Sequence, residues 1–248
     1  MTPGFAKSRK ELFWLPYPEP DKVIINAHNF TPAGPTLLGG EVAMWIATFD
    51  DAGNGTTTLN DFVGSDDGTL TNFALTGSTS NWVADTDASG VRCLAHDGSN
   101  DVVRGTGLPG LSGTTHSFAC WVKIAALAPI NGFVALTAGT GGRFWQIATA
   151  TQVYVCNTLV VVSAQTWVGA WTHIAFVASG SSVAFYRNGT LLGTGAAPSS
   201  VASGSKSWYL GDWSSGGFCL NGRMDDARVF NKALTAGEVS LLASKRGY

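Results

Sequence analysis

From residue 42 onward, short stretches of alternating apolar and polar residues follow one another, with turn-forming residues between them. In residues 116–124, HSFACWVKI, the side chains of Phe118, Cys120 and Val122 are expected on one face of a strand and the intervening ones on the other. Further strands are expected at 42–49, 91–96, 101–104, 132–136, 143–148, 152–156, 172–178, 182–187, 190–193, 208–211 and 218–230. Strands spaced in this way, without helices between them, predict an all-β protein built as an antiparallel two-sheet sandwich.

Two local signals are specific. Asn188-Gly189 lies between apolar stretches and predicts a two-residue hairpin, because both central residues of a type I′ turn need a positive φ. Thr235 and Glu238 fit a capping box, in which the threonine accepts from a first-turn amide and the glutamate reaches back. The chain is therefore expected to carry one short helix near its C-terminus.

Residues 1–41 differ from the rest of the chain. They hold six of the nine prolines, which predicts an extended N-terminal arm, since proline cannot donate to a sheet ladder. The arm also carries large apolar residues, among them Phe13, Trp14, Tyr17 and Ile24, which must be covered. Packing on the protein's own sandwich and binding to another subunit remain equal alternatives.

The composition narrows the possible classes of fold and function. Only 13% of the residues are charged and only four are Glu, which argues against exposed helix faces. A net charge of −2 gives no field that would attract nucleic acid or an anionic membrane. No signal-peptide stretch and no membrane-spanning run is recognised, so a soluble protein is expected that does not use the ordinary secretory route.

Several segments resemble laminin-G-like domains of the concanavalin A-like lectin and glucanase group. Residues 171–189 are similar to that family's tryptophan–histidine strand and following hairpin, and residues 220–239 resemble its closing strand and helix. Residues 96–103 are similar to a further motif of the family, Phe-Asp-Gly-x-x-Asp-aromatic-hydrophobic, with His96 in place of the usual Phe. The resemblance covers about residues 42–243 and implies a jelly roll, assigned to residues 42–248, with first and last strands adjacent. Members bind glycans or proteins, and some hold Ca²⁺.

Catalysis is not expected. Related glycoside hydrolases carry a Glu-x-Asp-x-x-Glu strand, and here only Glu19 and Asp21 match it in part, inside the proline-rich arm. Glu41 and Glu238 stand alone, and glycoside hydrolysis needs two carboxyl groups at a fixed separation. The histidines show no metal-binding spacing either. The prediction is a binding or structural protein and not an enzyme.

A calcium site is considered because residues 23–91 hold eight acidic residues and no Lys or Arg. Its ligands would come from neighbouring terminal strands: Asp50, Asp51, Asp225 and Asp226. The alternative is ordinary turn chemistry, with Asp225 paired to Arg228 or Arg223.

The four cysteines are widely spaced, which argues against zinc, and three of them lie in apolar strand patterns. A disulfide stays open.

A glycan site would need exposed aromatic rings beside polar groups. The chosen candidates are Trp213 and Asp212, in a Gly/Ser-rich loop, together with Trp145; Trp82, Trp167 and Trp208 are also considered, whereas Trp45, Trp121 and Trp171 fit core strands.

These observations favour a non-catalytic component of a virus particle, a capsid or tail decoration protein of a phage. The arm would clamp onto other virion subunits, a homo-oligomer is expected, and the sandwich would face outward to stabilise the shell or bind glycans. The alternative is a bacterial surface or secreted lectin-like module, which would be extracellular or on the cell surface.

Overall fold

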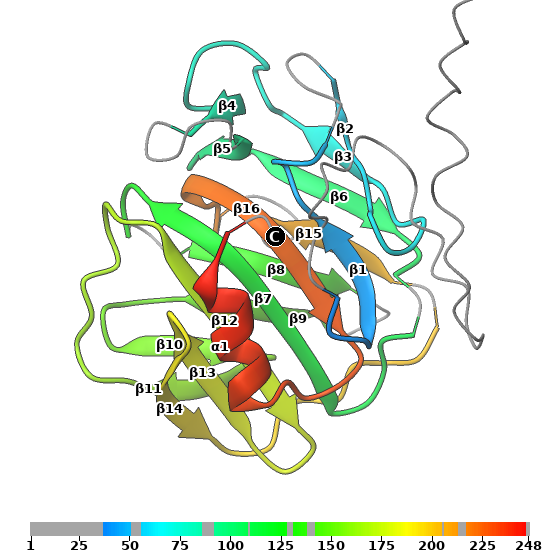
Figure 1. Ribbon diagram of the computed structural model, residues 1–248, viewed down its shortest axis with the longest axis vertical. Coiled ribbons are helices and arrows are strands. Elements are labelled where there is room, and N and C mark those ends of the chain that lie inside the picture. Colours follow the sequence, from blue (N-terminus) through cyan, green and yellow to red (C-terminus); the bar gives the residue numbers. More distant parts are fainter. Residues whose placement is uncertain are drawn as a thin grey trace, which may run out of the picture.

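The computed structural model describes residues 37–50, 56–85, 92–108, 110–127, 131–137, 142–204, 206–212 and 217–246. Within these residues the chain forms two antiparallel sheets of eight strands each, packed face to face, with one short helix on the outside (Figure 1). The predicted all-β sandwich with a C-terminal helix is confirmed. Residues 1–36 of the predicted arm, which include Phe13, Trp14, Tyr17 and Ile24, lie outside the described residues. Glu41, predicted as the last residue of the arm, instead begins the first described strand.

The first sheet, sheet A, is built around the last strand, β16 (Asn221–Phe230). β16 pairs with β1 (Glu41–Trp45), so the first and last strands are adjacent, as the laminin-G resemblance implied. The other strands of sheet A are β14 (Thr190–Gly195), β13 (Val183–Arg187), β12 (Thr172–Ser179) and β7 (Thr115–Ile124) on one side of β16, and β5 (Arg92–Asp97) and β4 (Asn81–Ala84) on the other.

The second sheet, sheet B, runs in the order β11, β10, β9, β8, β15, β6, β3, β2. Its strands are β11 (Thr158–Val161), β10 (Gln152–Val155), β9 (Arg143–Ile147), β8 (Asn131–Thr137), β15 (Ser207–Leu210), β6 (Val102–Thr106), β3 (Gly68–Thr71) and β2 (Thr58–Leu59). Strands β2, β3, β4 and β11 were not predicted from the sequence. Each has only two to four residues, at or below the shortest run in which an alternating pattern can be recognised.

The alternation along β7 decides which side chains enter the core. Phe118 and Cys120 lie in the main core between the sheets, whereas Ala119 faces outward, under the helix. Between the sheets, the rings of Trp45 and Trp208 approach to 4.3 Å between centroids. All four cysteines are buried and free, so the disulfide that the sequence left open is absent.

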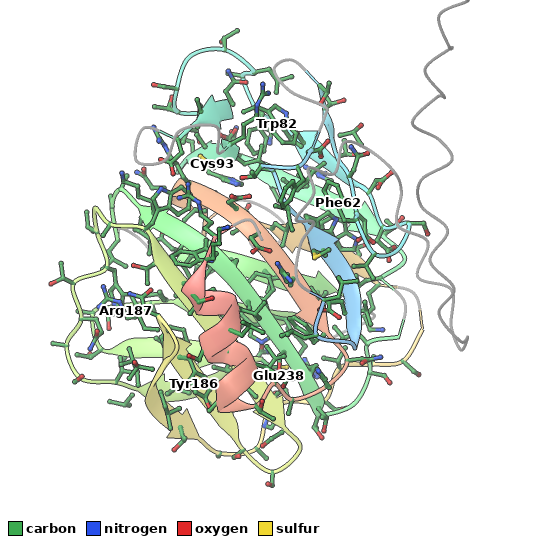
Figure 2. The ribbon with its side chains drawn as sticks, viewed as in Figure 1. Phe62, Trp82, Cys93, Tyr186, Arg187 and Glu238 are labelled. Atoms are coloured by element: carbon green, nitrogen blue, oxygen red, sulfur yellow. The ribbon has the colours of Figure 1, made fainter. Side chains whose placement is uncertain are left out.

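Helix α1 (Ala236–Ser244) lies across the outer face of sheet A (Figure 1). Its Val239 and Leu242 pack on that face, and Tyr186 of β13 lies against the same cluster (Figure 2). The predicted capping box is confirmed, because Thr235 Oγ1 accepts from the Glu238 amide at 3.2 Å and Glu238 Oε2 accepts from the Thr235 amide at 2.8 Å. The described part of the chain holds no helix long and apolar enough to cross a membrane.

The predicted hairpin at Asn188-Gly189 is confirmed as well. Asn188 has φ 47° and Gly189 has φ 79°, and β13 and β14 pair on either side of them. Both residues therefore lie in the left-handed region that a type I′ turn requires.

His116 is a polar residue buried in the core. His116 on β7 is 1% exposed, its ring meets the edge of the Trp145 ring at 5.5 Å, and neither ring nitrogen has a hydrogen-bond partner among the described residues. Burial disfavours the imidazolium and lowers the pKa of His116 from 6.5 to about 4. The folded protein therefore holds this histidine neutral at pH values where the unfolded chain would protonate it.

Replacing His116 with Phe tests this burial. Because the folded-state pKa lies below the unfolded value, wild-type stability is lost as the pH falls from about 6.5 toward 4. The stability of His116→Phe relative to wild type should rise by about 2 kcal/mol between pH 7 and pH 5, measured by urea unfolding. His96 and His173 are present in both proteins and cancel in the comparison. Parallel pH profiles for the two proteins would contradict the assignment.

Candidate functional site

Of the residues chosen for a glycan site, the two that the structure describes, Trp145 and Asp212, are buried. Trp145 is 2% exposed and lies between the sheets, so its prediction as a glycan contact is wrong. Asp212 is also 2% exposed, and its Oδ1 accepts from the Phe218 amide at 3.4 Å. Trp213 lies outside the described residues. The alternation of β9 explains Trp145, because that strand turns Trp145 inward and Phe144 outward.

The burial of the other tryptophans differs from the prediction. Those considered as further glycan contacts, Trp82, Trp167 and Trp208, are all buried. Trp121 and Trp171, which were predicted to be core residues, are only half-buried on sheet A. Trp121 faces outward because it alternates with the core residue Cys120, and it meets the ring of His173 at 5.5 Å.

The acidic residues proposed for Ca²⁺ are held by donors of the chain itself. Asp50 accepts from the Asn60 amide at 2.7 Å and from its side-chain nitrogen at 2.5 Å. Asp226 accepts from Arg228 Nε at 2.6 Å. Asp51 lies outside the described residues, and no three acidic, His or Cys side chains converge as a metal site within the part that is described. The described acids Asp50, Asp225 and Asp226 therefore do not gather into a cluster of metal ligands.

The acidic loop before β3 follows the turn-chemistry alternative. The carboxylate of Asp61 accepts from four backbone amides, at distances of 2.9 to 3.2 Å. Asp67 in turn accepts from the Asp61 amide at 2.8 Å. The acids of this loop therefore organise its backbone.

A β-bulge on β16 sets the position of the paired acids Asp225 and Asp226. The register with β7 shifts between Asp225 and Arg228, and Asp226 has φ 49°. Asp226 and Arg228 form a buried ion pair, with side chains 4% and 1% exposed. The expected pairing of Asp225 with Arg228 or Arg223 is therefore wrong: Asp226 takes Arg228, and Arg223 lies 4.0 Å from Asp85.

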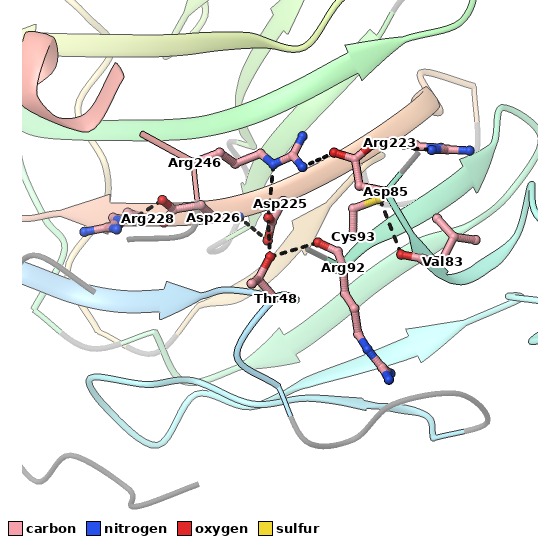
Figure 3. Close-up of polar contacts among 10 residues, drawn as sticks. All are labelled: Thr48, Val83, Asp85, Arg92, Cys93, Arg223, Asp225, Asp226, Arg228 and Arg246. Carbon is pink, nitrogen blue, oxygen red and sulfur yellow. Dashed lines mark hydrogen bonds and ion pairs between the residues drawn. The ribbon is translucent and has the colours of Figure 1, made fainter. Parts of the chain in front are cut away.

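The C-terminal segment returns to this bulge through Arg246 (Figure 3). Its guanidinium pairs with Asp85, lies 3.6 Å from Asp225 Oδ2 through Nε, and stacks over the Trp171 ring at 3.9 Å. Thr48 Oγ1 lies 2.9 Å from Asp225 Oδ2. Burial, and next the neighbouring Asp226, raise the pKa of Asp225 to about 7. The network closes this part of the face with contacts inside the chain. It could not be predicted from the sequence, because Lys245 and Arg246 follow the helix without any motif that indicates a partner.

The two described glutamates are structural as well. Glu41 Oε1 accepts from the Leu38 amide at 2.6 Å. Glu238 closes the capping box and pairs with Lys232 at 2.6 Å. Glu19 and Asp21 lie outside the described residues. The described glutamates therefore offer no pair for glycoside hydrolysis.

Sheet B carries a row of half-buried aromatic side chains on its outer face. Phe144 on β9, Tyr154 on β10 and Tyr209 on β15 alternate with inward residues of their strands. The rings of Phe144 and Tyr154 are 5.7 Å apart. Ala135 on β8 pairs with both Phe144 and Tyr209 and so places a small side chain between the two rings. From β10 to β15 the row spans about 14 Å, three strand spacings.

Polar and apolar groups flank this row, called here the sheet B aromatic row. Arg104 on β6 is exposed and pairs with Tyr209, and Thr69 on β3 pairs with Arg104. At the other end, Leu159 and Val161 on β11 are 39% and 65% exposed. Only tryptophans were considered as stacking residues in the prediction from the sequence, so Phe144, Tyr154 and Tyr209 were not predicted. The available signal was their period-two position opposite the core residues of each strand.

The Arg246 network can be tested by Arg246→Met. This change leaves the Asp85 and Asp225 side chains, both 0% exposed, without their close guanidinium. We expect the free energy of unfolding to fall by about 3 kcal/mol in urea denaturation. Adding Asp85→Asn to that variant should recover part of the loss, and Lys245→Met serves as the neighbouring control. A change below about 0.5 kcal/mol, the size expected for a plain surface substitution, would contradict the network's structural role.

Comparisons with solved structures agree with the sandwich. Domain 4 of AbnA, a GH43 extracellular arabinanase from Geobacillus stearothermophilus, solved with arabinotriose, is similar at a TM-score of 0.59 and 23% identity, covering 82% of this chain and 98% of that one. A Trypanosoma rangeli sialidase with 2,3-difluorosialic acid is similar at a TM-score of 0.58 and 13% identity, covering 86% of this chain and only 35% of the sialidase. At these identities the likeness concerns the fold.

Sequence comparison gives the family. A search of curated proteins finds no match to this chain. A laminin-G family model, described as the concanavalin A-like lectin/glucanases superfamily, matches residues 97–240, more than half of the chain. That stretch contains β16, the capping box and the hairpin at Asn188-Gly189, the segments that carried the resemblance. The chain therefore belongs to the concanavalin A-like lectin/glucanase superfamily.

Proposed function

We propose that this chain is a non-catalytic carbohydrate-binding protein that holds a glycan on the outer face of sheet B. The observation that carries the proposal is the sheet B aromatic row of Phe144, Tyr154 and Tyr209, with Arg104 beside it. The apolar face of a sugar packs on such rings, and the flanking polar group can hydrogen-bond its hydroxyls.

The position of the row supports this choice of face. The outer face of sheet A is covered by α1 at one part and by the Arg246 network at another. Phe144, Tyr154 and Tyr209 are more exposed than the inward tryptophans and face away from the core. An extended oligosaccharide could lie along the row and contact several rings at once.

The superfamily and the fold support carbohydrate binding, but they do not identify the sugar. The superfamily takes its name from both lectins and glucanases, so the fold alone fits either activity. Domain 4 of the Geobacillus arabinanase, which has a similar fold, was solved in complex with the oligosaccharide arabinotriose. The structural use of Glu41 and Glu238 favours binding over hydrolysis.

A glycan array compared between the wild type and Phe144→Ala/Tyr209→Ala tests the proposal. We expect the wild type to bind, and the double variant to lose at least tenfold in affinity, about 1.4 kcal/mol, because two stacking faces are removed. Leu191→Ala/Leu241→Ala, which removes exposed side chains of β14 and α1, should bind like wild type. Equal binding by both double variants would show that the glycan lies elsewhere.

A virion location extends this proposal and is supported by the sequence of residues 1–41 alone. In it, Phe13, Trp14, Tyr17 and Ile24 anchor the chain to other subunits of a phage particle or to further copies of itself, and the sandwich faces outward. An extracellular or cell-surface lectin is the alternative location.

Deletion of residues 1–36 tests the anchoring. The first strand begins at Glu41, so the truncated chain should keep the circular dichroism spectrum and unfolding midpoint of the sandwich. We expect the deletion to abolish incorporation into particles and to reduce the size measured by light scattering. Unchanged incorporation and size would rule out an anchoring arm.

A further inference from the structure

A pocket of about 410 Å³ lies at one end of the sandwich, away from the aromatic rings of sheet B. Its walls come from the β6–β7 connection (Gly107, Gly110, Ser112) and the β14–β15 connection (Ser203, Gly204, Lys206). Each connection crosses from one sheet to the other, so the pocket opens at the rim between the sheets. We call it the rim pocket. Its volume falls in the range of about 300–1,000 Å³ that is usual for small-molecule sites.

The backbone holds the two connections together at both ends of the pocket. The Gly107 amide donates to the Lys206 carbonyl at 2.8 Å. Gly113 and Val201 exchange backbone hydrogen bonds at 2.8 and 2.7 Å. The pocket therefore lies between two fixed backbone pairs.

Glycine shapes the interior. Gly107, Gly110 and Gly204 have φ values of 100°, 71° and 89°, in the left-handed region that side chains disfavour. A side chain added at Gly204 would meet no atom within 4 Å, so the absence of a Cβ there leaves open space. The positive φ values of these turns therefore favour glycine, and at Gly204 they leave open space beside the backbone.

Lys206 lines the rim pocket and carries a buried positive charge. The residue is only 2% exposed, and its Nζ donates to the Gly204 carbonyl at 2.7 Å. An ammonium has three donors, and among the described residues no carboxylate lies within ion-pair distance of Nζ. Burial lowers the pKa of Lys206. A buried cation without a counter-charge is costly, so an anion entering the pocket would gain from pairing with it.

Two hydroxyls complete the polar lining. Ser112 and Ser203 are exposed, one on each connection, and neither hydroxyl has a hydrogen-bond partner among the described residues. Asp66 lies next to Gly107, because a Cβ atom added at Gly107 would stand 3.5 Å from Asp66 Oδ1. Burial, followed by Asp61 and Asp67, raises the pKa of Asp66 to about 6, which reduces its repulsion of an anion in mildly acidic solution.

We propose that the rim pocket binds the carboxylate of a sugar acid, with Lys206 Nζ pairing to the carboxylate and the hydroxyls of Ser112 and Ser203 contacting the sugar hydroxyls. A sugar acid combines one anionic group with several hydroxyls, which matches one ammonium and two serines in a small pocket. The site goes beyond the proposed function, since it shares no residue with the sheet B aromatic row.

Isothermal titration of the full chain with glucuronate and glucose tests the proposal, because the two sugars differ in a carboxylate on the same ring. We expect glucuronate to bind at least tenfold more tightly than glucose, and 0.5 M NaCl to weaken it. Lys206→Met should lose at least tenfold in glucuronate affinity, whereas Lys206→Arg, which keeps the charge, should retain most of it. Equal affinity for the two sugars, or no binding of glucuronate, would overturn the proposal.

Three further arms separate the alternatives. The midpoint of thermal unfolding of Lys206→Met should equal or exceed that of wild type, because the variant removes a buried charge that has no counter-charge. If that variant fails to fold, Ser112→Ala/Ser203→Ala must show the loss of glucuronate affinity in its place. Sulfate that binds as tightly as glucuronate would show a general anion site and would overturn the sugar-acid assignment. Phe144→Ala/Tyr209→Ala should bind glucuronate like wild type, so the failure of one site is distinguished from the failure of the other.

Discussion

Strand β16 has to pair with three strands at once, and the arrangement of sheet A depends on how it does so. Along one edge it pairs with β7. Along the other edge, residues 221–224 pair with β5 and residues 227–230 pair with β1. The bulge at Asp225 and Asp226 falls where one partner ends and the other begins. Thr48, just after β1, lies 3.1 Å from the Arg92 carbonyl at the start of β5 and 2.9 Å from Asp225, and so bridges the two partners.

Several charged residues of this chain serve the same task. Arg228 neutralises Asp226 inside the bulge, and Arg246 brings the C-terminal segment back to Asp85 and Asp225. Groups that resembled metal ligands or catalytic acids in the sequence are therefore used to hold the backbone. A buried acid that accepts several hydrogen bonds from its own chain has little capacity left for a ligand.

These structural uses occupy two parts of the outer face of sheet A, and both proposed sites lie on other surfaces. Sheet B turns Phe144, Tyr154 and Tyr209 outward, and the rim between the sheets carries a pocket with the buried ammonium of Lys206. The first surface offers apolar rings, and the second offers a charge with hydroxyls. The two proposed sites therefore fit different parts of a carbohydrate: a neutral ring face and a carboxylate.

The sequence by itself determined the hairpin at Asn188-Gly189 and the capped helix, because each depends on contacts between residues close along the chain. It also determined the all-β sandwich class, because the alternation of apolar and polar residues is a local signal for strands. It could not place Trp145, because an alternating strand shows two faces without saying which one meets the other sheet. It also could not find the partner of Asp225, 21 residues away at Arg246, or the meeting of Ser112 with Lys206 across two connections. Those contacts are long-range, and only the packing of the two sheets decides them.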